Sequence, residues 1–196
     1  TLSNMMGTTS FMREDVLMIG LCGVVGVCMP FPLLFRFKFR FTNRQLLLGA
    51  ALGIALCNLL CMHVQSIPVL CVISFIAGFL KLCGTFECMS NIQLWMAPGR
   101  DSIFFPLLYM IVVGCMNMSS WVANQLTYHL GSWMMMHWFM IGLLLIVALT
   151  VYVLTRNVRL MPKVSMISVD WLGCVLWSLF LLEGIWIFTY GEYYNW

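Results

Sequence analysis

Two ionisable residues stand in a strongly apolar stretch of the chain, FIAGFLKLCGTFECMSNIQLW. Lys81 falls near the middle of this stretch, and Glu87 follows six residues later. A charged side chain at the centre of a membrane helix costs about 2.5–3.5 kcal/mol on insertion scales. At roughly 100° per residue the two side chains lie about 240° apart, so they occupy different helix faces. A helix that is polar on two sides belongs in a bundle interior or beside a water-filled cavity.

Proton exchange is the chemistry that these residues could perform. Glu87 shares its stripe with Ser90 and Asn91, whereas Lys81 shares its own with Thr85 and Cys88. We expect Glu87 to exchange protons, with Lys81 tuning that acid or binding an anionic group. The alternative for both is a bond to a neighbouring helix that only holds the bundle together. A further proton-coupling candidate is Glu183, in the last apolar stretch.

A second polar stripe follows helical spacing in a later apolar stretch. Asn117, Trp121, Asn124 and Tyr128 recur at i, i+4, i+7 and i+11. Uncharged polar and aromatic groups suit the wall of a cavity for amphipathic cations, although interhelical hydrogen bonding explains them equally well. The candidates for a substrate cavity are Asn91, Asn117, Ser120, Trp121, Asn124 and Tyr128.

The composition indicates which elements must position these groups. The chain has 196 residues, 62% hydrophobic and 9% charged, with a mean hydropathy of +0.96. Soluble domains carry about 25% charged residues, so the chain is predicted to be an all-α, polytopic membrane bundle. Six spans are predicted: Val16–Phe35, Leu46–Met62, Ile67–Met96, Ile103–Tyr128, Met134–Leu154 and Val169–Thr189.

These spans divide the chain into four parts. We expect an external loop over 1–15, a transporter bundle over 16–154 and a cytoplasmic loop over 155–168. Residues 169–196 then form an additional helix and the start of an external loop. The glycines Gly20, Gly23 and Gly26 should let the first helix approach a neighbour closely, and Met29-Pro30-Phe31-Pro32 should kink it.

The cations fix the expected orientation. The first predicted loop, within FRFKFRFTNRQ, carries Arg36, Lys38, Arg40 and Arg44. Arg100, Arg156, Arg159 and Lys163 fall in loops on the same side, and only Arg13 falls on the other. The positive-inside rule makes the cation-rich loops cytoplasmic and both termini external. The phenylalanines then lie at the interface and the cations reach headgroups and water. A nucleic-acid role is disfavoured, because a short loop offers too little surface.

No cofactor, metal or enzyme activity is predicted. The nine cysteines all fall within predicted spans without a C-x-x-C pair, and the 17 methionines are best explained as apolar substitutes for leucine. An enzyme would need a nucleophile and base, or paired metal ligands, at one depth, and none is found.

The final segment resembles the seventh helix of the fourteen-helix drug:proton antiporters of the major facilitator superfamily (the EmrB/QacA type). It opens with Asp170-Trp171-Leu172-Gly173 and ends in a Gly-x-x-x-Asp/Asn-Trp-like stretch from Gly191 to Trp196. The first loop falls where the superfamily carries Gly-x-x-x-Asp-Arg-x-Gly-Arg-Arg. Here Arg40 and Arg44 match cationic positions, whereas Phe35, Phe39 and Thr42 replace the first Gly, the Asp and the second Gly.

The resemblance implies a fragment that covers roughly helices two to seven of such an antiporter. Proton-coupled efflux by alternating access in the bacterial inner membrane would follow. The implied partners are the lipid bilayer, a small amphipathic substrate, protons and, for some such pumps, a periplasmic adaptor protein. The segment around Gly114 lacks the proline of the Gly-Pro-x-x-x-Gly-Gly-like antiporter motif. A channel, a uniporter or a non-transporting membrane subunit remains the alternative.

Overall fold

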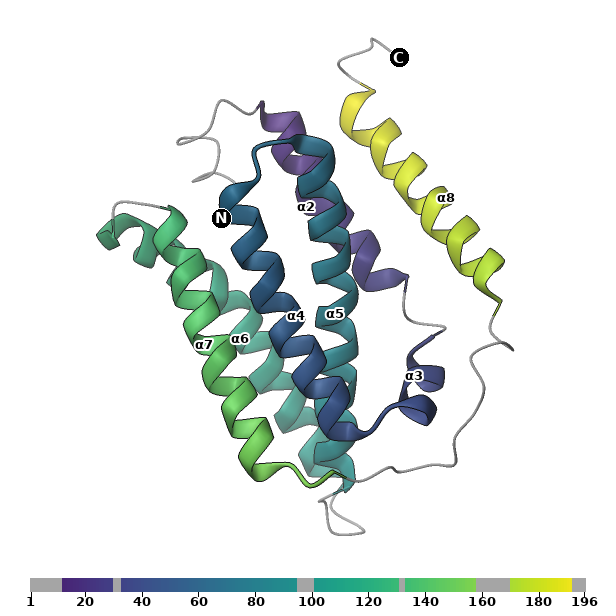
Figure 1. Ribbon diagram of the computed structural model, residues 1–196, viewed down its shortest axis with the longest axis vertical. Coiled ribbons are helices and arrows are strands. Elements are labelled where there is room, and N and C mark those ends of the chain that lie inside the picture. The colour runs from purple at the N-terminus through teal and green to yellow at the C-terminus, as the bar shows by residue number, and fades with distance from the viewer. Residues whose placement is uncertain (1–11, 30–32, 95–100, 131–132, 158–169, 192–196) are drawn as a thin grey trace.

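The computed structural model describes residues 12–29, 33–94, 101–130, 133–157 and 170–191, and every regular element among them is a helix (Figure 1). The prediction of an all-α chain is therefore confirmed for these residues. The helices are α2 (Arg13–Cys28), α3 (Leu34–Arg40), α4 (Asn43–His63), α5 (Ile67–Leu94), α6 (Asp101–Leu130), α7 (Trp133–Leu154) and α8 (Trp171–Tyr190).

Five helices, α4 to α8, are long and apolar enough to cross a membrane. Each coincides with one of the predicted spans from the second to the sixth, apart from a few residues at the ends. The first span, Val16–Phe35, is not one kinked helix: α2 ends at Cys28 after 16 residues, and the separate helix α3 begins at Leu34. The physical reason lies in Pro30 and Pro32, because proline has no N–H to donate and disfavours helical geometry in the residue before it.

Pairwise packing connects the long helices in the order α8, α2, α5, α4, α7, α6. The central pair is α5 and α4: α5 packs on α2 and α4, and α4 also packs on α7. At the margins, α8 packs on α2 and α6 packs on α7. The short helix α3 lies against α5, so it belongs to the packed part of the molecule.

Glycine permits the close contact between α2 and α5. A Cβ atom on Gly26 would lie 2.1 Å from the main-chain oxygen of Phe75, and one on Gly78 would lie 2.1 Å from that of Gly23. Only glycine fits at such distances, which a real Cβ never shows. The expectation of close approach is therefore confirmed for Gly26, whereas a Cβ atom on Gly23 would lie an ordinary 3.5 Å from the main-chain oxygen of Ser74.

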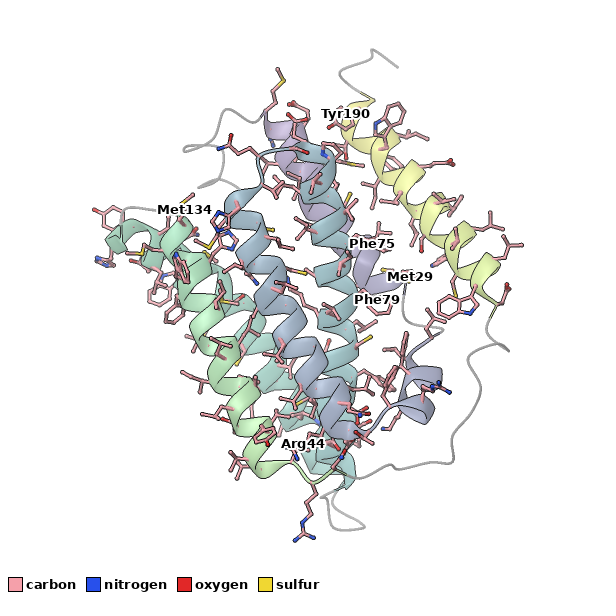
Figure 2. All side chains as sticks on the ribbon, viewed as in Figure 1. Met29, Arg44, Phe75, Phe79, Met134 and Tyr190 are labelled. Atoms are coloured by element: carbon pink, nitrogen blue, oxygen red, sulfur yellow. The ribbon has the colours of Figure 1, made fainter. Side chains whose placement is uncertain are left out.

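Successive long helices run in opposite directions, which sorts the cations between the two ends of the molecule. Figure 2 shows Arg44 at the end opposite Tyr190. The backbone of α3, with its three cationic positions, and Arg156 after α7 lie at the Arg44 end, whereas Arg13 begins α2 at the Tyr190 end. Arg100, Arg159 and Lys163 lie outside the described residues.

Candidate functional site

Five polar residues meet at the cation-rich end of the molecule, where α3, α4 and α5 come together. We call them the polar cluster: Lys38, Asn43, Glu87, Ser90 and Asn91. Lys38 comes from α3 and Asn43 from the first turn of α4, while the other three come from the last two turns of α5.

Glu87 is the buried centre of the polar cluster, with only 1% of its surface exposed. The side-chain nitrogen of Asn91 donates to the main-chain oxygen of Glu87 at 2.8 Å and to its Oε1 at 3.3 Å. Oε2 is buried and has no hydrogen-bond donor among the described residues. Burying an ionised carboxylate with half of its acceptor capacity unused costs several kcal/mol, so this oxygen favours a proton or another cationic partner.

Asn43 extends the polar cluster from α5 to α4. Its Nδ2 donates to Oδ1 of Asn91, and its own Oδ1 is buried without a donor among the described residues. The side chain stands at the start of α4 because Thr42 caps that helix. Thr42 Oγ1 accepts from the Gln45 amide at 3.4 Å, and Gln45 Oε1 accepts from the Thr42 amide at 3.2 Å. This reciprocal capping box fixes where α4 begins.

Lys38 attaches α3 to α5. Its Nζ donates to Oγ of Ser90 and lies 5.7 Å from the centre of the Phe86 ring, a cation–π distance. It is also near enough to Glu87 for their opposite charges to attract. The neighbouring Phe37 ring also packs on α5, where it meets the Phe79 ring edge to face at 5.7 Å between centres. Lys38 therefore contacts protein groups of α5, in addition to the headgroups and water that the sequence predicts for the cations of this segment.

The other cations of this segment have different surroundings. Arg44 places its guanidinium carbon 4.0 Å from the centre of the Tyr152 ring on α7, and so it joins α4 to α7. Arg40 is exposed, and the side chain of Arg36 lies outside the described residues. The stretch FRFKFRFTNRQ is thus a short docked helix followed by a helix cap.

Lys81 and Glu183 lie away from the polar cluster. Lys81 is exposed on α5 while Glu87 is buried, which agrees with their expected placement on different faces. The expectation that Lys81 lies in a bundle interior is not met by the described helices. Glu183 is exposed on α8, a marginal helix that packs on α2.

The predicted stripe on α6 is also exposed, so it does not line a cavity between the described helices. Trp121 and Tyr128 are 61% and 83% exposed. Asn124 is exposed too, and Asn117 donates to the main-chain oxygen of Val113 in its own helix at 2.8 Å. The side chain of Ser120 lies outside the described residues. Of the predicted cavity residues, only Asn91 adjoins Glu87.

Sequence reasoning did not identify Asn43 as a site residue. The available signal was the capping-box pattern in which Thr42 is followed three residues later by Gln45. This pattern places Asn43, directly after Thr42, in the first turn of a helix. Among the residues that the structure describes, no three His, Cys, Asp or Glu side chains converge as metal ligands.

No model of a protein family, no curated protein and no solved structure matches this chain. Its function is therefore inferred from the polar cluster and from the helices that hold it.

Proposed function

We propose that this chain is part of a proton-coupled membrane transporter that exports small amphipathic compounds, and that Glu87 exchanges the proton. The observation that carries the proposal is the burial of Glu87 on α5, a helix able to cross a membrane, with no described residue donating to its Oε2. A carboxylate held in this way is more stable after it takes up a proton. Its charge can therefore change whenever the protein opens a path to water.

In this proposal the proton binds at Oε2, because Oε1 already accepts from Asn91. Alternating access would open the junction of α3, α4 and α5 to water in one state and close it in the other. Lys38 would partly neutralise the carboxylate after the proton leaves. Substrate contacts are assigned to the α6 stripe and to Asn91, and an anionic group would pair with Lys81.

The resemblance to fourteen-helix drug:proton antiporters of the major facilitator superfamily supports this assignment. Asp170, which opens the stretch that carries the resemblance, caps α8: its side chain accepts from the Gly173 amide at 2.9 Å. On this basis we propose a bacterial inner-membrane location with the cation-rich end in the cytoplasm. A periplasmic adaptor belongs to the same proposal.

A membrane subunit that does not itself transport is the second candidate. The observation that favours it is the exposure of Lys81 and of the aromatic residues of α6, which suits contacts with a partner protein. A channel or uniporter would use the same helices without proton coupling.

The test is efflux of a fluorescent amphipathic cation from proteoliposomes that contain the full-length protein, driven by an imposed pH gradient. We expect Glu87→Gln to lower proton-driven efflux at least tenfold while dye binding is retained. Glu183→Gln, an exposed acid on another membrane helix, is the matched control and should transport normally. Undiminished proton-driven efflux by the Glu87 variant would contradict the assignment. A wild-type protein that moves no dye would favour the subunit.

A further inference from the structure

Two buried oxygens in the polar cluster accept no hydrogen bond from the described residues: Oε2 of Glu87 and Oδ1 of Asn43. Both belong to groups that Asn91 already connects, since its amide accepts from Asn43 and donates to Glu87. The hydrogen bonds described in the cluster end on other atoms, since Lys38 Nζ donates to Ser90 and Asn43 Nδ2 donates to Asn91. The polar cluster therefore has unused acceptors, one of which carries negative charge.

The orientation of the two amides follows from the bonds around them. Nδ2 of Asn91 must face the main-chain oxygen and Oε1 of Glu87. An amide oxygen turned toward these two atoms would meet acceptors only. Oδ1 of Asn91 then faces Asn43 and requires a donor, which only Nδ2 of Asn43 supplies. Exchanging the two amide atoms of Asn43 would break this bond, so its free atom is an oxygen.

We propose that Glu87 Oε2 and Asn43 Oδ1 are ligands of a sodium ion that binds between α4 and α5, in competition with the proton. This inference rests on the proposed function and names a second coupling ion for the same carboxylate. Carboxylate and amide oxygens are ligands that hard cations prefer. One cation satisfies both open acceptors and balances the buried charge, whereas a bridging water satisfies the acceptors and leaves the charge.

The charge of the site selects a monovalent ion. Glu87 supplies a single negative charge, and Lys38 already lies within its electrostatic reach. Because the charges of Glu87 and Lys38 are opposite, a divalent ion would leave two net positive charges at the site and a monovalent ion only one, so the divalent ion is less favourable. Removing the charge of Lys38 should therefore strengthen sodium binding. Removing either ligand, Glu87 or Asn43, should weaken it.

The experiment measures the thermal stability of the purified full-length protein in NaCl, in KCl and in choline chloride at constant ionic strength. A ligand that binds only the folded state raises Tm by mass action. A sodium concentration of ten times Kd should raise Tm by about 3 °C or more. We expect NaCl alone to stabilise the wild type. Glu87→Gln and Asn43→Ala should lose this rise, and Lys38→Gln should show it at a sodium concentration at least threefold lower. Thr150→Ala should keep it. Thr150 is the control because its hydroxyl donates to Ile146 within α7 and its side chain is exposed.

Three results would overturn the sodium site. They are equal effects of the three salts on the wild type, a sodium effect that survives both ligand substitutions, and a Lys38→Gln midpoint equal to that of the wild type. The Lys38 arm decides the matter even if the ligand variants do not fold, because it leaves both open oxygens in place. If sodium does not stabilise the protein specifically but Glu87→Gln still loses proton-driven efflux, the proposed transport function stands without the sodium site. Sodium-specific stabilisation without any transport would reject that function and retain the ion site.

Discussion

Lys38 on α3 donates a hydrogen bond to Ser90 on α5, and the two residues are 52 positions apart in the chain. This bond, together with the position of Lys38 over Phe86, holds α3 against the helix that carries Glu87. Any movement of α3 therefore changes the surroundings of the buried carboxylate directly.

Loss of the Lys38 side chain should loosen α3. A net hydrogen-bond contribution of about 0.5–1.5 kcal/mol corresponds to roughly two- to tenfold faster opening, so the amides of 34–40 should exchange faster in Lys38→Gln by that factor. Hydrogen exchange followed by mass spectrometry measures this rate. Arg40→Gln is the control, because Arg40 is exposed on the same helix. Equal exchange in the two variants would show that Lys38 does not anchor α3.

The contact between α2 and α5 should not tolerate a methyl group. Gly26→Ala places a Cβ 2.1 Å from the Phe75 main-chain oxygen, so the helices must separate, at a cost of about 1–3 kcal/mol. Thermal unfolding in detergent should show a Tm lower by several degrees. Gly142→Ala is the control, since no atom lies within 4 Å of the position of its Cβ. An unchanged Tm for Gly26→Ala would mean that α2 and α5 do not pack this closely.

The hydrogen bond between Tyr190 and Asp15 joins α8 to α2. The Tyr190 hydroxyl donates to Oδ1 of Asp15 at 3.2 Å, at the end of the molecule away from the polar cluster. Tyr190→Phe should lower the free energy of unfolding by about 0.5–1.5 kcal/mol. Tyr128→Phe removes a hydroxyl from a side chain that is 83% exposed and should have little effect. If both variants lose the same stability, the bond to Asp15 contributes nothing.

The pair Asn58 and His137 should show measurable coupling between α4 and α7. The amide nitrogen of Asn58 donates to the Ile54 main-chain oxygen at 2.9 Å, so its Oδ1 accepts from Nδ1–H of His137, also at 2.9 Å. A double-mutant cycle with alanine at both positions should give a coupling energy of about 0.6 kcal/mol. The control cycle pairs Asn58 with Thr150, whose hydroxyl bonds within α7, and should give no coupling. A coupling energy of zero in both cycles would exclude the hydrogen bond between Asn58 and His137.

The second to sixth helical spans and the interior position of Glu87 could be predicted from the sequence, because each depends on local properties. Long apolar runs specify helices in a membrane, and the cost of a buried charge directs Glu87 inward. The docking of Lys38 on Ser90 could not be predicted, since it depends on which helices pack together. The same limit applies to Lys81 and to the stripe around Trp121: spacing defines a helix face, but it does not say which neighbour that face meets.

Lys81 provides a separate test of what the exposed face of α5 contacts. A lysine facing hydrocarbon would cost about 2.5–3.5 kcal/mol, so we expect water or a protein group beside it. In a background without the nine native cysteines, Lys81→Cys should react with a membrane-impermeant methanethiosulfonate reagent in liposomes. The matched control is Val72→Cys on the same helix, at an apolar position that is 58% exposed and should face lipid and stay unlabelled. Equal labelling at positions 81 and 72 would show that both sides of α5 are equally accessible to water. A Lys81→Cys protein that resists the reagent but forms cross-links to a neighbouring chain would assign this face to a partner and favour the membrane-subunit function.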